Sequence, residues 1–304
     1  MIIFLQATVE GLSLAAIYSL VAIGFVLIYK AMEVLSFAQP ALAVVGAGII
    51  SSLAVDRGMP FWIALILGVI LTGIVGLVIE RTFLRPMVGE PVFSVAVLTI
   101  GIDILLRTVL DSWIGINPKY LGDPFPSYGN FGAVNIGGVN IKLLELAALI
   151  TAVILIIILT IFFKKSKYGI AMRATSYDQE AAMAQGINVG RIFGLVWLIA
   201  GILAAFAGFF ITGGFNTLTQ FSFVSALRAL PAVVIGGLDS IPGAVVGSII
   251  IGITQGYEAY YQLSFESFIG FSVGNGFSVV APYLIMLSLI HISEPTRPLY
   301  ISYA

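Results

Sequence analysis

The chain has 304 residues, of which 60% are hydrophobic and 10% are charged, and its formal net charge is -1. Soluble domains average roughly 45–50% apolar and about 25% charged residues, so this composition excludes an ordinary soluble protein and indicates an integral membrane protein surrounded by lipid. The small net charge gives no indication of a nucleic-acid partner, and the absence of cysteine excludes disulfides and thiolate metal sites.

The hydropathy pattern predicts an all-α fold, a polytopic transmembrane helix bundle of about eight or nine spans, because a helix needs about 20 mostly apolar residues to cross the bilayer. Lys30, the first basic residue, follows the first apolar stretch, so we expect this stretch to stay as a helix. The stretch 226–238 is too short for a ~30 Å hydrocarbon core and contains Pro231, which predicts a broken or re-entrant element. The predicted spans are 7–28, 34–55, 61–80, 92–111, 143–163, 192–214, 226–238 and 242–262, and a last one beginning near 277.

The loops between these spans predict the orientation, because lysine and arginine concentrate in cytoplasmic loops. With the N-terminus outside, the inside loops hold Lys30, Arg81, Arg85, Lys164, Lys165, Lys167, Arg173 and Arg191. The outside loops then hold only Arg57, Lys119 and Lys142. We therefore predict an external N-terminus, an external loop over 114–140 with a small hairpin at its Gly and Asn turns, and a cytoplasmic segment over 164–191.

The cytoplasmic segment contains a predicted short helix that begins at Ser176 or Asp178 and ends at Gln185, with Gly186 as its stop. Acidic residues in its first turn favour the helix, and its alanines leave a surface without bulk. The local pattern alone favours an ordinary amphipathic connector between two spans.

Two motifs resemble a known family. Glu180-Ala181-Ala182, followed after three residues by Gly186, resembles the coupling helix by which ABC importer permeases dock on their ATPase subunits, although the usual Ile-x-Leu-Pro continuation is missing. The segment 228–247, with Gly236-Gly237, Ser240 and Pro242-Gly243-Ala244, is similar to the Gly-Gly-x-x-Ser-x-Pro-Gly-Ala segment of branched-chain amino acid ABC transporter permeases.

With the segments 11–20 and 81–86, the resemblance covers nearly everything up to Met286, and it is strongest to the LivH-type subunit. One departure bears on the substrate. The family usually carries Asn-Phe-Ala-His-Gly early in the second span, whereas this chain has Ser36-Phe37-Ala38-Gln39-Pro40.

The resemblance implies the permease subunit of an ATP-driven importer for branched-chain amino acids or a related small polar solute, in a prokaryotic plasma (inner) membrane. It implies four kinds of partner besides membrane lipid: a second, LivM-type permease subunit, two cytoplasmic ATP-binding subunits, an extracytoplasmic substrate-binding protein and the amino acid itself. It implies no cofactor, no metal and no catalysis by this chain, which also lacks a Walker-type phosphate-binding motif.

Residue by residue, the resemblance implies ATPase coupling by Glu180, Ala181, Ala182 and Gly186. A substrate path is a weaker expectation from two Pro-to-Gly strings, 40–46 and 231–236, because transporters often hold substrate between broken helices. It would involve Gln39, Pro40, Pro231 and Gly236, unless the likeness of the two strings is a coincidence.

Charges in or near the spans carry further expectations. Asp103 and Arg107 lie four residues apart on one helix face and could neutralise each other. Glu80 and Glu10 lie near span ends, which predicts interfacial positions, and Arg228 is expected to extend its head group to water. Small-residue spacings such as Gly252-x-x-x-Gly256 predict close helix packing within the fold.

The end of the chain has a different character. The run from Leu287 to Arg297 resembles the translation of a sequencing-library adapter, and it contains the only histidine, His291. We therefore predict one permease domain over 1–286 and a foreign tail over 287–304.

Two other classes of protein stay open at this point. A self-sufficient channel or ion-coupled secondary transporter usually has ionisable residues in mid-span for the coupling ion, and here only Asp103 and Arg107 qualify. An intramembrane enzyme would need catalytic groups that this chain does not supply, since it has no cysteine and its histidine lies in the predicted foreign tail.

Overall fold

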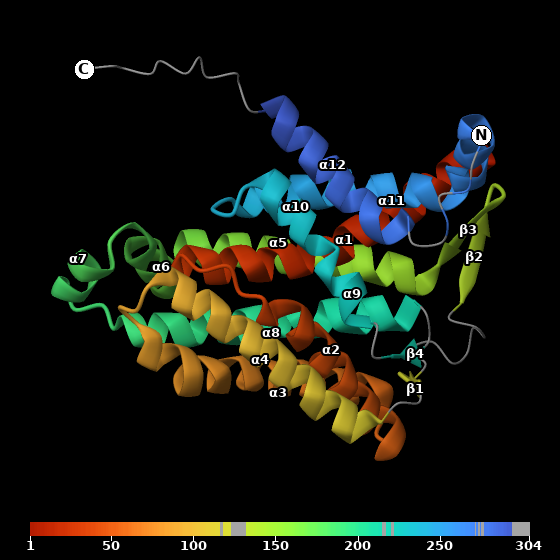
Figure 1. Cartoon of the computed structure of the whole chain (residues 1–304). Helices are drawn as coiled ribbons and strands as arrows, with labels where there is room; N and C mark the ends of the chain where they lie inside the picture. The colour runs from red at the N-terminus through yellow and green to blue at the C-terminus, as the bar shows by residue number, and fades with distance from the viewer. Residues whose placement is uncertain are drawn as a thin grey trace, which may run out of the picture.

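The computed structural model describes residues 1–115, 118–122, 132–214, 217–219, 222–270, 272, 274 and 277–293. Long apolar helices cross the molecule and short strands lie at one end (Figure 1). In chain order the elements are α1 (Ile2–Met32), α2 (Ala38–Ser51), the π-helix η1 (Ser52–Asp56), α3 (Phe61–Ile79), the π-helix η2 (Glu80–Leu84), the 3-10 helix η3 (Arg85–Met87), α4 (Val92–Ile114), β1 (Lys119–Tyr120), β2 (Ala133–Ile136), β3 (Val139–Lys142), α5 (Leu143–Lys165), α6 (Lys167–Tyr177), α7 (Gln179–Ala184), α8 (Val189–Gly214), β4 (Thr217–Leu218), α9 (Ser222–Leu227), α10 (Ala229–Gly236), α11 (Ile241–Ile269) and α12 (Phe277–Ser293).

Six helical stretches in the described part of the chain are long and apolar enough to cross a membrane. They are Ile2–Met32, Ala38–Asp56, Phe61–Met87, Val92–Trp113, Leu143–Lys165 and Val189–Gly213. α11 has 29 residues, about 43 Å at 1.5 Å per residue, but Gln255 and Glu258 lower its apolarity. Each predicted span falls on a helix or on the pair α9 and α10, so the predicted polytopic helix bundle is confirmed.

The predicted break near 226–238 is present, because α9 ends at Leu227 and α10 begins at Ala229. Pro231 is the third residue of α10, has no N–H, and its ring keeps the Leu227 carbonyl out of a helical hydrogen bond. The hydroxyl of Tyr283 on α12 donates to that carbonyl at 3.3 Å. A backbone carbonyl freed inside an apolar bundle needs such a partner, so the break is satisfied by a neighbouring helix.

The core lies along α1, α2 and α8, whose most apolar 18-residue windows are 83%, 78% and 72% buried. α1 and α11 pack with their backbones nearly touching. A Cβ built on Gly256 would lie 2.4 Å from the Ala7 carbonyl oxygen, and one on Gly252 would lie 2.4 Å from the Ala15 nitrogen. The predicted small-residue spacing on α11 therefore serves packing within the fold.

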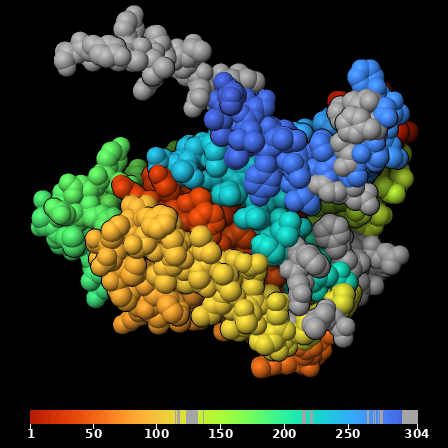
Figure 2. Space-filling view, in the orientation of Figure 1, coloured from red at the N-terminus to blue at the C-terminus, as the bar shows by residue number. Residues whose placement is uncertain are grey.

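The apolar surface of the bundle is carried largely by α4 and α5, of whose most apolar windows only 22% and 17% are buried. Figure 2 shows α4, in orange to yellow, across much of the near face. On α5 the exposed large side chains are Leu146, Ile150, Val153, Ile154, Ile157, Ile158 and Ile161. Such a surface is stable in lipid and would aggregate in water.

The two ends of the bundle differ. α6 and α7 project at one end, and the N-terminus lies with the strands at the other (Figure 1). β2 and β3 form an antiparallel hairpin around Gly137 and Gly138, as predicted, and β1 pairs with β4. The predicted loop residues 116–117 and 123–131 lie outside the described part. The segments assigned to opposite sides of the membrane thus lie at opposite ends, while the side that each end faces stays a prediction.

The helix α12 passes the predicted domain boundary at Met286 without a break and continues to Ser293. It leans away from the bundle in Figure 1. The assignment of 287–304 as foreign sequence therefore stays a prediction, and residues 294–304 lie outside the described part.

Candidate coupling site and transport path

The predicted short helix is α7, and its two ends are fixed by local hydrogen bonds. The Asp178 carboxylate accepts from the Ala181 amide at 2.9 Å and caps the first turn. At the other end Gly186 has a φ of +81°, its N–H donates to the Met183 carbonyl, and Ile187 N–H donates to the Ala182 carbonyl. This pair of bonds is a Schellman motif, which requires a left-handed residue that glycine supplies without strain.

The four predicted coupling residues do not share one face of α7. Glu180, Ala181 and Gly186 are exposed, whereas Ala182 is 4% exposed and packs into this chain. Met183 adds a large apolar side chain that is 53% exposed. The surface available to a partner therefore consists of Glu180, Ala181, Met183 and the turn at Gly186.

A groove of about 540 Å³ lies between α7 and the segment that follows α3. Its walls include Arg85, Val88, Met183, Ile187 and Phe193. This wall is largely apolar. The groove lies beside the short helix α7 and opens to solvent at the exposed Met183. An apolar side chain would fit this groove, and docking of a partner there stays a prediction.

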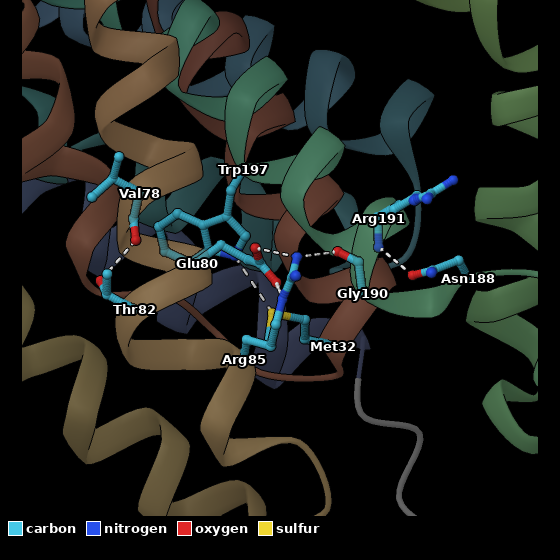
Figure 3. A network of polar contacts seen from close by, with 9 residues as sticks. All are labelled: Met32, Val78, Glu80, Thr82, Arg85, Asn188, Gly190, Arg191 and Trp197. Atoms are coloured by element: carbon cyan, nitrogen blue, oxygen red, sulfur yellow. Dashed lines mark hydrogen bonds and ion pairs between the residues drawn. The ribbon is translucent and has the colours of Figure 1, made fainter.

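In the wall of this groove, a half-buried ion pair joins the end of α3 to the start of α8 (Figure 3). Arg85 donates from Nε to Glu80 Oε1 at 3.1 Å and from Nη2 to Glu80 Oε2 at 3.0 Å. The same Nη2 donates to the Gly190 carbonyl at 2.6 Å. We call Glu80, Arg85 and Gly190 the clamp; it links η2, η3 and the N-terminal turn of α8, four residues after Gly186.

Glu80 lies at the end of α3, and its side chain is 0% exposed and paired with Arg85; its predicted interfacial depth stays a prediction. The pairing depends on the π-helix η2, in which the Arg85 N–H bonds to the Glu80 carbonyl. In a π-helix, residues five apart lie one turn apart on the same face. In an α-helix, residues five apart lie on different faces. The periodicity of an α-helix therefore could not predict this ion pair. The sequence signal for it was a carboxylate five residues before an Arg-Pro pair.

A second contact ties α8 to the end of α1 near the clamp. Trp197 is fully buried, and its indole N–H faces the Met32 sulfur at 3.4 Å (Figure 3). α1, α3 and α8 are thus held together directly beneath α7.

The predicted path residues are placed on two separate helices. Gln39 and Pro40 on α2 are buried, and Gln39 Nε2 donates to the Ala200 carbonyl at 3.1 Å. Pro231 is buried on α10, and Gly236 packs against the backbone of Gly243. α2 packs mainly on α8, α3 and α4, whereas α10 packs mainly on α11, α1 and α12, so the two strings are not packed as a pair. Their role in a path stays a prediction.

The Asp103 and Arg107 side chains do form the predicted ion pair on α4. Arg107 also lies over the Phe223 ring of α9, 4.3 Å from its centroid. The pair therefore anchors the lipid-facing α4 to α9.

Sequence reasoning missed a polar cluster at the break between α9 and α10. Arg228 does not extend to water as expected; it is half-buried, and its Nε has no hydrogen-bond partner. It lies beside the Tyr18 hydroxyl, which bonds to Gln255, and Gln255 Nε2 donates to the Ser278 carbonyl at 3.0 Å. In the described residues, no group of three or more His, Cys, Asp and Glu could hold a metal ion.

Residues 7–289 match the model of the family described as the branched-chain amino acid transport system / permease component. The chain belongs to this family. It is 26% identical over 283 residues to the high-affinity branched-chain amino acid transport system permease protein LivH of Escherichia coli K12, covering 89% of this chain and 91% of that protein. It is 27% identical over 266 residues to the corresponding protein BraD of Pseudomonas aeruginosa, covering 84% and 86%.

The fold is also similar to a solved structure, PsaBC from Streptococcus pneumoniae in complex with Fab, with a TM-score of 0.51. That likeness covers 97% of this chain and 92% of the other at 17% identity, and so concerns the fold alone. As a member of the permease family with six apolar spans, the chain is a membrane transport permease, and the predicted family is confirmed.

Proposed function

We propose that this chain is the permease subunit of an ATP-driven importer for branched-chain amino acids or a related small polar solute. It forms part of the translocation path together with a second, LivM-type permease subunit. Two cytoplasmic ATP-binding subunits supply the energy, and an extracytoplasmic binding protein delivers the solute. The observation that carries the proposal is the family match over residues 7–289, joined to an exposed, doubly capped helix α7.

α7 is the element through which ATP binding would act on the permease. A nucleotide state can shift the conformation of this chain only through a contact that differs between states. The exposed Glu180, Ala181 and Met183 provide the contact surface, and the Schellman turn at Gly186 fixes its angle. The clamp then passes a displacement of α7 to α3 and α8 together.

The proposed orientation puts α6 and α7 in the cytoplasm and the hairpin of β2 and β3 outside. The support is the excess of lysine and arginine in the loops at the α7 end. An importer needs its ATPases and its binding protein on opposite sides, and the two ends of the bundle supply one docking surface each.

The test replaces residues on the docking surface. Gly186→Val puts a β-branched residue at a φ of +81°, where a Cβ is strained although nothing lies within 4 Å. Ala181→Trp adds bulk at an exposed position. Both should leave the protein inserted but abolish ATP-dependent uptake of radiolabelled leucine and weaken co-purification of the ATPase, in cells without their own importer.

The matched control is Gly270→Val at the other end of the molecule, where a left-handed glycine with φ of +80° also ends a helix and nothing lies within 4 Å. It carries the same backbone strain and should keep both uptake and ATPase binding. Ala182→Trp is a poor probe because Ala182 is buried in this chain. Normal uptake by both Gly186→Val and Ala181→Trp would remove α7 from the coupling path and leave it an ordinary connector.

A further inference from the structure

A cavity of about 320 Å³ lies inside this single chain, between α1, α5, α8 and α9. Lys142, at the end of β3, belongs to its wall and has a side chain that is 54% exposed, so the cavity reaches the surface at the strand end of the bundle. Its volume lies in the range of small-molecule sites, about 300–1,000 Å³. A solute of fewer than ten heavy atoms would fill much of it.

The polar part of the wall carries both signs of charge, each with an unused hydrogen-bonding atom. Arg228 Nε is buried without a partner at the break between α9 and α10. Glu145 uses Oε1 to pair with Lys142 at 3.2 Å, whereas its Oε2 is buried without a partner. A buried polar atom left unpaired costs free energy, so a ligand that bonds to these atoms recovers what the empty site loses.

The position of Arg228 follows from the sequence. Pro231 ends α9 at Leu227 and turns the chain, so the side chain at the corner is directed between helices instead of along a lipid-facing surface. The Tyr18 hydroxyl and the Ser225 side chain belong to the same wall. The Tyr18 proton is already donated to Gln255. The donors left for a carboxylate are therefore those of the Arg228 guanidinium, which are planar and arranged in a fork, and that of the Ser225 hydroxyl.

The rest of the wall is apolar and comes from Leu14, Ile17, Leu144, Phe210 and Ile211. An aliphatic side chain of four carbons would bury its surface there, at about 25 cal/mol per Å². The cavity thus combines a guanidinium whose Nε is unpaired, a carboxylate whose Oε2 is unpaired and an aliphatic wall. This combination fits a zwitterion with an aliphatic side chain better than it fits water, a sugar or a metal ion.

We propose that this cavity binds an aliphatic α-amino acid within the permease itself, with its carboxylate on Arg228 and its ammonium group on Glu145. The inference rests on the proposed function for its choice of solute. It adds a weak site at the predicted outer end of one subunit, where solute released by the binding protein would be held before the path opens.

The experiment measures binding of tritiated L-leucine to the full-length chain in lipid nanodiscs, without ATP. We expect saturable binding that unlabelled leucine displaces. 4-Methylpentanoate lacks the ammonium group and 3-methylbutylamine lacks the carboxylate, and each should compete at least about tenfold more weakly, because each loses a charge-assisted hydrogen bond. Arg228→Gln and Glu145→Gln should each weaken leucine binding by a similar factor.

Arg57→Gln is the matched control, because Arg57 is exposed at the same end of the bundle and outside the cavity wall. It should bind leucine as the wild type does. If Arg228→Gln does not fold, Glu145→Gln still decides, because Glu145 lies in the first turn of α5 and not on the helices that the break joins. Unaltered binding by Glu145→Gln, competition by either analogue as strong as that by unlabelled leucine, or no leucine binding up to 10 mM would overturn the proposal.

Retention of a zwitterionic lipid in the cavity, seen by native mass spectrometry and undisturbed by leucine, would overturn it as well. Failure of this binding site can be distinguished from failure of the proposed function. Wild-type cells that import leucine through this chain while the purified chain binds none would leave the importer intact and remove the cavity site.

Discussion

Glu80→Gln tests whether the clamp carries the coupling signal. The amide keeps one acceptor for Arg85 but turns an N–H₂ group towards the second guanidinium nitrogen, so one of the two bonds at 3.0–3.1 Å is replaced by two facing donors. Losing a charge-assisted hydrogen bond costs about 1.5–3 kcal/mol. Because Arg85 is 38% exposed and can be rehydrated, we expect about 2 kcal/mol.

About 2 kcal/mol corresponds to a roughly 30-fold rise in the population of the released clamp. The variant should therefore insert into the membrane, bind its ATPase and still hydrolyse ATP. The amount of leucine transported for each ATP hydrolysed should fall at least about tenfold. The assay measures ATP hydrolysis and leucine uptake by the same reconstituted complex, together with thermal unfolding in detergent. Thr82→Ala, on the exposed side of the same π-helix, is the control.

In a double-mutant cycle with Arg85→Gln, the two changes should be strongly non-additive, because both break one interaction. An additive cycle, or a Glu80→Gln variant with unchanged transport per ATP and unchanged unfolding temperature, would refute the role of the clamp.

Three further predictions concern topology, packing and the tail. In intact cells an impermeant thiol reagent should label Asn135→Cys but label Tyr177→Cys only after lysis; the reverse pattern would invert the orientation. Gly256→Leu should abolish accumulation of the folded protein, because a Cβ there overlaps the α1 backbone, whereas Gly101→Leu, which has nothing within 4 Å, should not. Equal accumulation of these two variants would show that α1 and α11 do not pack as described. Deleting the residues after Met286 should leave leucine uptake unchanged, and loss of uptake would show that the tail is native.

The helix bundle was predictable because hydropathy depends only on composition along the chain. A run of apolar residues that cannot satisfy its backbone in lipid must form a helix, wherever it later packs. The ends of α7 were predictable for a similar reason, since Asp178 and Gly186 act on backbone groups two to four residues away. The Asp103 and Arg107 pair also lies within one turn of one helix.

What the sequence could not show depends on contacts between distant segments or on irregular turns. Glu80 reaches Arg85 only because η2 is a π-helix, and the third member of the clamp, Gly190, follows Arg85 by 105 residues. Arg228 was misjudged because its surroundings, Tyr18 and Gln255 among them, come from α1 and α11. Ala182 faces inward because α7 packs on α6 and α8. The six residues of α7 are too short a pattern to predict which face is buried.

The most direct measurement of the central claim is leucine uptake into proteoliposomes that contain this chain, its partner permease and the ATP-binding subunits, with binding protein outside the vesicles and ATP inside. Uptake should require hydrolysable ATP, and it should be lost with Gly186→Val and retained with Gly270→Val. Uptake by this chain alone, driven by an ion gradient and indifferent to ATP and to Gly186→Val, would contradict the account and identify a secondary transporter.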